Sequence, residues 1–279
     1  MAPLLALTAA AAYGVADFLG GVAARREPSS AVVLWSHVVG LLLLVVAAPG
    51  LGGDITARGL GVGAAAGLLG GTGVALFYRA LSLGSMSVVA PIGALLSAAV
   101  PVVAGIGSGE RPQAPALAGI ALALVAVTLV SREPARNSPA GARVRLQPLL
   151  LAVAAGLAFG LFFVTLDGAG TGVGIWPLLG ARVASISLFT ALGAAGLTAA
   201  SPPRSAAGAA VGCGLLDAAA NVFYVLALSH GLLSVVAVLT ALYPAGTVVL
   251  ARCVLGERLS GVQQAGLTVA GAAAILIAA

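Results

Sequence analysis

Two aspartates lie deep inside long apolar segments of a chain that carries few charges. Of its 279 residues, 61% are hydrophobic and 8% are charged. Asp17 has Tyr13 four residues before it, and Asp217 has Asn221 four residues after it, so each pair would share one helix face. A carboxylate in hydrocarbon costs about 2.5–3.5 kcal/mol on insertion scales, and such groups usually face a bundle interior and serve a function. We therefore expect both pairs to line a polar cavity that binds a substrate or a proton.

Each aspartate also has a purely structural interpretation. Asp17 is near the charged end of its segment, where Arg25 or water could neutralise it. Asp217 and Asn221 could form a polar clamp between helices, worth about 0.6 kcal/mol per hydrogen bond. Tyr224 extends the stripe of Asp217 by another turn, and the matching positions in the other half of the chain are glycine or apolar. That asymmetry favours a site for one asymmetric molecule.

Three further kinds of side chain could contribute to the same site. Arg182 lies two turns inside Trp176, where it could bind a carboxylate or an anionic group, or could extend to the membrane surface. His37 could titrate near neutral pH, although a single histidine near a membrane edge is more often a structural donor. Phe159 and Phe163 are four residues apart and would form either a packing stripe or an aromatic cavity wall.

A second polar stripe surrounds a proline near the end of the chain. Thr240 and Tyr243 would face the same side of a helix that contains Pro244. Proline has no backbone donor, so it frees a carbonyl in the preceding turn. This stripe therefore predicts a kink, a binding site or both.

These candidates must be positioned by membrane helices. A bilayer core requires about 20 apolar residues per helix, and nothing in the sequence alternates like barrel strands. Ten such segments are predicted, at 3–23, 31–49, 59–81, 86–106, 114–131, 148–167, 175–199, 206–229, 232–255 and 261–279. The predicted fold class is all-α integral membrane.

The chain contains an internal duplication. The stretch from Phe77 to Arg111 recurs 147 residues later, and both copies end in Gly-Glu-Arg, at Glu110 and Glu257. The polar stretch 132–147 separates a first five-helix repeat, 1–131, from a second, 148–279. Five spans per repeat force the two repeats into opposite orientations, the inverted arrangement of secondary transporters with a substrate site at the repeat interface. The two Glu-Arg pairs are expected to form turns and gate contacts.

The distribution of charge excludes some functions and predicts an orientation. All thirteen basic residues are arginines, scattered through the chain without an aromatic-rich basic patch, which excludes nucleic-acid binding. Even-numbered loops hold only Arg58 and Arg111. Odd-numbered loops hold Arg25, Arg26, Arg132, Arg136, Arg143, Arg145, Arg204 and Arg258, with Arg79 and Arg252 at their borders. The positive-inside rule would place the odd loops in the cytoplasm and both termini outside.

Two stretches, one near each end of the chain, resemble parts of a known module. The stretch LYPAGTVVLARCVLGERLSGVQQAGLTVAGAAAILIA resembles the end of an EamA-type module, in which a proline, here Pro244, is followed thirteen residues later by the glutamate of a Leu-Gly-Glu turn, here Glu257. The stretch YGVADFLGGVAARR resembles the first helix of that module. The first repeat departs from the pattern, because Ser97 takes the place of the proline.

The resemblance covers nearly the whole chain and implies the drug/metabolite transporter superfamily. It implies ten helices in two inverted repeats around a central cavity, lined mainly by helices 1, 3, 4, 6, 8 and 9. It also implies that both termini are cytoplasmic, against the arginine distribution, so the orientation stays open.

The predicted function is secondary active transport, in the cell membrane, of a small metabolite or drug-like molecule. Efflux by alternating access is the favoured form, and one carboxylate could couple transport to protons, since burial favours its protonated form. The alternative is a membrane scaffold or sensor that transports nothing, and a channel is a third class. No phosphate loop, metal cluster or catalytic set is present, so neither enzyme activity nor a cofactor is expected. Whether two copies form a homodimer is left open.

Overall fold

The computed structural model describes residues 1–83, 86–130, 146–246 and 260–278. In these residues the backbone forms ten α-helices and one short 3-10 helix. The helices are α1 (Ala2–Ala24), α2 (Ser29–Leu51), α3 (Ala57–Leu83), α4 (Met86–Gly107), α5 (Ala114–Val130), α6 (Leu146–Asp167), α7 (Trp176–Ala194), η2 (Arg204–Ala206), α8 (Ala207–Leu228), α9 (Leu233–Thr240) and α11 (Gly261–Ala278). Six of the apolar helices are long enough to cross a membrane, and four are shorter. The predicted all-α fold class is confirmed.

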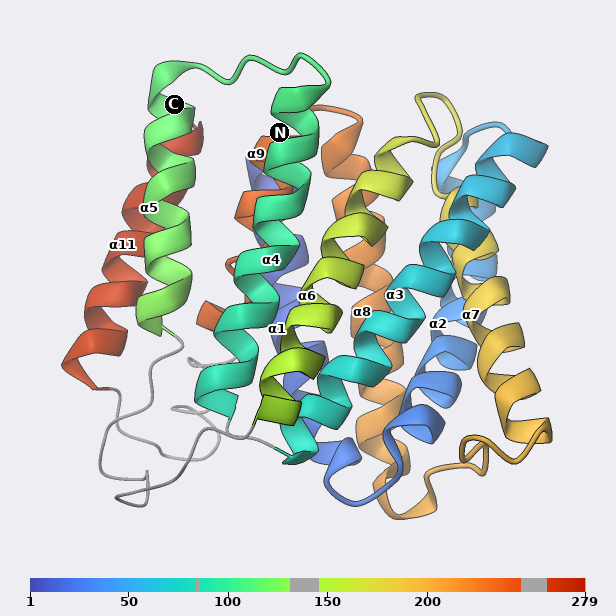
Figure 1. Cartoon of the computed structure of the whole chain (residues 1–279). Helices are drawn as coiled ribbons and strands as arrows, with labels where there is room; N and C mark the ends of the chain where they lie inside the picture. The colour runs from blue at the N-terminus through green and yellow to red at the C-terminus, as the bar shows by residue number, and fades with distance from the viewer. Residues whose placement is uncertain (84–85, 131–145, 247–259, 279) are drawn as a thin grey trace.

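All ten helices run up and down across one bundle (Figure 1). Helix α1 begins and α11 ends at the same face of the bundle, which we call the terminal face. Helix α5 ends and α6 begins at the other face, which we call the opposite face. Because α1 starts at the terminal face and α6 starts at the opposite face, the second half of the chain is inverted relative to the first.

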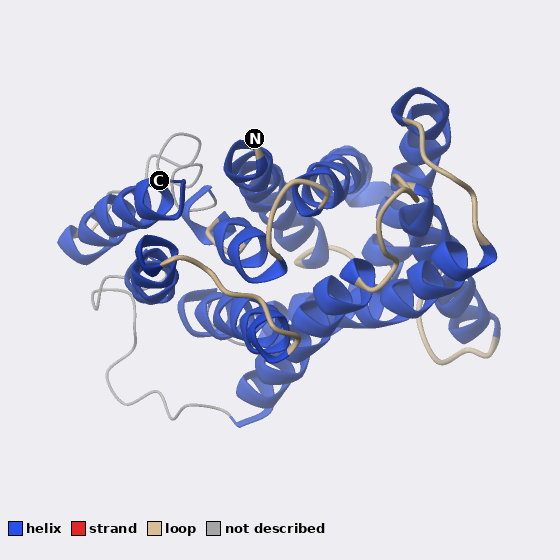
Figure 2. Cartoon of the chain, turned by 90° about the horizontal axis from the view of Figure 1, so that it is seen from above, coloured by secondary structure: helices blue, strands red, loops and turns tan. Residues whose placement is uncertain are grey.

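The helix contacts follow this inversion. Helix α1 packs along α8, and its counterpart α6 packs along α3, the counterpart of α8. Helices α5 and α11, the last helix of each half, pack against each other at one edge of the bundle (Figure 2). The central bundle therefore consists of the first four helices of both halves.

Two tryptophans at equivalent positions join the halves. The indole N–H of Trp35, early in α2, donates to the carbonyl of Ala200 at 3.0 Å, in the loop between α7 and α8. The indole N–H of Trp176, the first residue of α7, donates to the carbonyl of Gly53 at 3.0 Å, in the loop between α2 and α3. Each tryptophan thus binds the loop of the other half, at opposite faces of the bundle.

Glycines bring α3 and α7 into close contact. A Cβ atom at Gly63 would overlap the backbone of Pro177, and one at Gly67 would overlap the backbone of Ala181. Membrane helices have little hydrophobic drive to associate, so such close approach supplies the packing energy. This contact positions α7, and with it Arg182, against the centre of the bundle.

One predicted helix ends early, and another is interrupted. The segment predicted at 175–199 ends at Ala194, because Gly196 has a φ of 70° and its turn closes the helix. The segment predicted at 232–255 is interrupted at residues 241–242, with helix resuming at 243–246. The ring of Pro244 would clash with the carbonyl of Thr240 and removes a donor, which accounts for the break. The remainder of that segment, with Glu257, lies outside the described residues.

Candidate functional site

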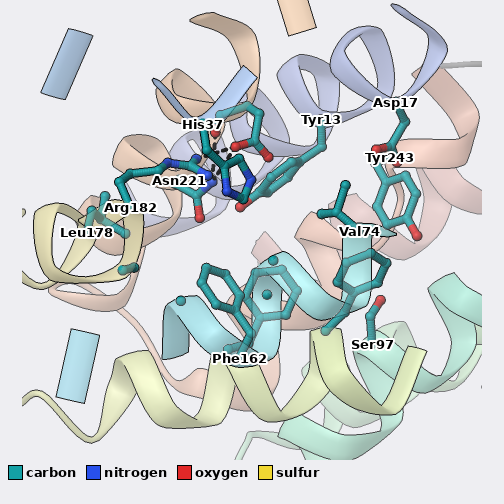
Figure 3. Close-up of a pocket in the computed structure, with 17 residues that line it drawn as sticks. Tyr13, Asp17, His37, Val74, Ser97, Phe162, Leu178, Arg182, Asn221 and Tyr243 are labelled. Carbon is teal, nitrogen blue, oxygen red and sulfur yellow. Dashed lines mark hydrogen bonds and ion pairs between the residues drawn. The ribbon is translucent and has the colours of Figure 1, made fainter. Parts of the chain in front are cut away.

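A cavity of about 70 Å³ lies at the centre of the bundle (Figure 3). Seven helices and the segment after α9 contribute its wall, through Tyr13, Asp17, His37, Gly67, Gly70, Gly71, Val74, Ser97, Phe159, Phe162, Phe163, Leu178, Ala181, Arg182, Asp217, Asn221 and Tyr243. The wall thus includes α2 and α7, which the resemblance did not place among the main lining helices.

One end of the cavity holds an ion pair. The guanidinium of Arg182 on α7 donates to the carboxylate of Asp217 on α8. Their side chains are 9% and 20% exposed, so the pair lies at the cavity wall with little contact with solvent. The amide nitrogen of Asn221 donates to the backbone carbonyl of Asp217 at 2.7 Å. The polar stripe of α8 therefore pairs with α7, and its charge is balanced.

A histidine and a serine lie beside this ion pair. The Nδ1 atom of His37 on α2 and the hydroxyl of Ser185 on α7 are 2.7 Å apart in a hydrogen bond. Both residues are buried. His37 is labelled close to Arg182 and Asn221 in Figure 3. His37 therefore lies on the cavity wall, where it could contribute to the site, and it also makes a hydrogen bond between two helices.

Asp17 lies at the other end of the cavity. Figure 3 shows it next to Tyr243 and away from Arg182. Within the part of the chain that the structure describes, the carboxylate of Asp17 has neither a hydrogen-bond partner nor an ion-pair partner. Neutralisation by Arg25, which was the structural alternative for Asp17, is not seen among the described residues. The cavity therefore has one balanced charge pair and one carboxylate that a ligand or a proton could satisfy.

An aromatic wall runs between these two ends. The rings of Phe163 and Tyr13 meet edge to face with centroids 6.3 Å apart, and Phe162 lies 5.3 Å from Phe163. Such rings can hold a flat apolar group or a cation against their faces. The stripe of Phe159 and Phe163 predicted on α6 therefore lines the cavity and also packs against neighbouring aromatic rings.

Two buried polar atoms on the wall are unsatisfied. The hydroxyl of Tyr13 and the amide oxygen of Asn221 have no hydrogen-bond partner among the described residues. A buried polar group without a partner costs free energy, so such groups call for an explanation. Their position on the cavity wall provides one, because a bound molecule or water could pair with them.

Seven of the nine predicted site residues line this cavity: Tyr13, Asp17, Phe163, Arg182, Asp217, Asn221 and Tyr243. Tyr224 and Thr240 do not. Tyr224 is fully buried and stacks behind Phe163 with ring centroids 4.4 Å apart, and Thr240 is fully buried in α9. Both lie behind the wall rather than on it.

Other wall residues were not predicted. Phe162 and Leu178 are apolar residues in apolar helices, and Gly70 resembles every other glycine of α3. Their types carry no signal that separates a cavity wall from a lipid-facing surface. Ser97 stands out in the sequence as a departure from a family pattern, and its position as a polar residue inside an apolar run is the signal that could have marked it as a candidate.

Two inverted helical repeats around a central polar cavity define the class of membrane carriers. The profile of the EamA-like transporter family matches residues 1–132 and 146–279, so the chain belongs to that family. It is a multi-pass membrane protein of a transporter family and not an enzyme. Several solved structures are similar, among them a crystal structure at 17% identity with a TM-score of 0.80, over 99% of this chain and 98% of that one; this likeness shows the fold. A comparison with curated proteins found no match.

Proposed function

We propose that this protein is a secondary active transporter that moves a small amphipathic molecule out of the cell in exchange for protons. The observation that carries the proposal is the single unpartnered carboxylate of Asp17 in a cavity whose other charges, on Arg182 and Asp217, neutralise each other. The repeats at 1–131 and 148–279, joined by 132–147, would rock about the cavity to expose it to each side in turn.

The wall favours a substrate that combines a cationic group with a flat apolar part. With Arg182 and Asp217 paired and the imidazole of His37 neutral, the formal charge of the cavity equals the charge of Asp17. A protonated amine could occupy the space beside Asp17, and a planar group could lie against Phe162 and Phe163. The unsatisfied oxygen of Asn221 offers an additional acceptor for a donor on the substrate.

Asp17 could couple the substrate to protons by holding one or the other. A carboxylate surrounded by apolar helices is costly when charged and alone, so the empty carrier would keep a proton there. The cationic substrate would displace that proton. The other charged or titratable groups on the same wall are Tyr13 on α1, His37 on α2, Arg182 on α7, Asp217 on α8 and Tyr243 after α9.

The test is gradient-driven flux in reconstituted vesicles with a panel of aromatic amines. Wild-type protein should give saturable uptake that follows an imposed pH gradient. The variant Asp17→Asn should lose at least about tenfold in gradient-driven rate, the change that 1.4 kcal/mol of lost interaction produces. Asp54→Asn, at an exposed carboxylate in the loop between α2 and α3, is the matched control and should transport normally.

Two results would contradict the proposal. Equal dependence on the pH gradient in Asp17→Asn and wild-type protein would remove Asp17 from the coupling step. Absence of saturable flux for every amine of the panel would favour the scaffold or sensor function instead. Uptake that rises linearly with concentration would favour a channel.

A further inference from the structure

Glu110 lies just after α4, at the terminal face, in a turn that folds its side chain back over the helix end. Gly109 has a φ of 101°, and the N–H groups of Gly109 and Glu110 donate to the carbonyls of Ile106 and Gly105 at 3.1 and 2.9 Å. This is a Schellman ending, which requires the left-handed conformation of glycine. A Cβ atom at Gly105 would overlap the carboxylate of Glu110, so the glycine at that position leaves room for it.

The carboxylate of Glu110 caps a helix of the other half of the chain. One oxygen accepts from the backbone N–H of Leu233 at 2.6 Å, and the other accepts from that of Ser234 at 3.0 Å. These are the first two residues of α9, whose own N-cap residue, Leu232, makes no side-chain cap. A negative charge is favourable at a helix N-terminus. The first repeat thus supplies the cap that α9 of the second repeat lacks.

Helix α9 fills the terminal end of the bundle. Seven of its eight residues are buried, and it packs against α4 and α1. The chain just beyond α9 brings Tyr243 to the cavity, and α4 brings Ser97. Glu110 therefore holds together two helices from different repeats, each of which leads from the terminal face to the cavity wall.

Two hydroxyl groups on α9 are poorly accommodated in this arrangement. Ser234 and Thr240 are fully buried, and their hydroxyls have no hydrogen-bond partner among the described residues. Each unsatisfied group costs free energy. The break at residues 241–242 leaves α9 as a short unit separate from the helical turn that follows. A short helix with unsatisfied groups, held by a single external cap, is suited to adopting a second position.

We propose that Glu110 is the latch of the terminal face. While its carboxylate caps α9, the terminal end of the cavity is closed; when the cap is released, α9 moves away from α4 and that end opens. Glu110 is thus a positioning residue that acts through α9 and does not touch the substrate. The inference rests on the proposed transport function, but its principal test measures access to the cavity and needs no substrate.

The test uses a cysteine in the cavity wall, Val74→Cys, in a chain with Cys213→Ala and Cys253→Ala. A membrane-impermeant thiol reagent is added to one side of the vesicles at a time. A second cysteine variant at the exposed Thr171, in the loop between α6 and α7, identifies the side of the terminal face. Glu110→Gln should raise the rate of Val74→Cys modification from that side roughly fivefold or more, because the population of the open form rises when a charged cap is lost.

A replacement cap within the second repeat can distinguish a role of Glu110 in controlling access from a role in stabilising α9 alone. Leu232 already has the extended backbone of an N-cap residue, with φ −70° and ψ 143°, so Leu232→Ser can cap α9 from within its own repeat. In the double variant with Glu110→Gln, thermal stability should recover while the terminal-side modification stays fast. Recovery of slow modification together with stability would show that any cap suffices and would overturn the latch.

The remaining outcomes are equally decisive. Unchanged terminal-side modification in Glu110→Gln would overturn the proposal whatever the transport activity. Asp54→Asn removes a carboxylate from the same face without touching α9 and should leave the modification rate at the wild-type value. If wild-type protein transports none of the tested solutes while Glu110→Gln still changes access, the proposed function fails and the latch stands.

Discussion

Arg182 on α7 forms an ion pair with Asp217 on α8, and both side chains lie on the cavity wall. The two residues are 35 positions apart, and close contact between α3 and α7 helps to position the arginine. The pair removes one positive and one negative charge from the cavity. What remains is Asp17, and the proposed exchange of protons for a cation depends on that balance.

Neutralising one partner of this pair should destabilise the protein. Asp217→Asn would leave the Arg182 guanidinium unpaired, at a cost of about 2–3 kcal/mol, below the 3–5 kcal/mol of a fully sealed pair because both side chains reach the cavity. Thermal unfolding in detergent measures the loss. The double variant Arg182→Gln with Asp217→Asn should recover most of the stability. If the loss of stability in the double variant equalled the sum of the losses in the two single variants, the two residues would not stabilise the protein as an ion pair.

A methyl group should be tolerated at one glycine of α3 and harmful at another. A Cβ at Gly67 would overlap the backbone of Ala181, so Gly67→Ala should push α7 away and cost about 1–3 kcal/mol, the usual range for overpacking. A Cβ at Gly61, on the same helix, would meet nothing within 4 Å. Gly61→Ala should therefore match or exceed wild-type stability, since alanine is the better helix former.

The comparison of the two alanine variants is made by thermal unfolding and by expression in membranes. Because Ala181 precedes Arg182, displacement of α7 should also weaken the ion pair. Transport by Gly67→Ala should then fall even in the fraction that folds. Equal stability of the two variants would show that α3 and α7 are not in close contact at Gly67.

The loop between α1 and α2 contains a pH-dependent contact at the opposite face. The hydroxyl and the backbone N–H of Ser205 donate to one oxygen of Glu27 at 2.5 and 2.9 Å. These bonds, the hydroxyl first, lower the pKa of Glu27 below its ordinary value of 4.5. A lowered folded-state pKa means that the contact stabilises the protein above pH 4.5 and that this contribution is lost as the pH falls further.

Glu27→Gln should therefore unfold at a slightly lower temperature than wild type at pH 7, and the difference should shrink as the pH falls below 4.5. Melting curves in detergent across this pH range measure the effect. Ser205→Ala should show the same trend, and the double variant should add little to either single change. A difference that stayed constant between pH 7 and pH 3 would show that the charge of Glu27 is not what stabilises the contact.

Much of the architecture could be predicted from residue patterns alone. Long apolar segments must cross the membrane as helices, because backbone groups in lipid have to pair within their own segment. The repeat at an offset of 147 residues, with five segments in each half, led to the inverted topology. The cost of burying a charge singled out Asp17, Asp217 and Arg182 as cavity candidates, and all three lie on the cavity wall.

The partners of these residues were decided only by the tertiary structure. Hydropathy says which side chains leave water, but the face that each helix turns to its neighbours depends on close contacts such as that of Gly67 with Ala181. Those contacts join Arg182 to Asp217, leave Asp17 unpaired, and place Tyr224 behind Phe163 instead of on the wall. The cap that Glu110 provides for α9 spans 123 positions of sequence, and no local pattern could reveal it.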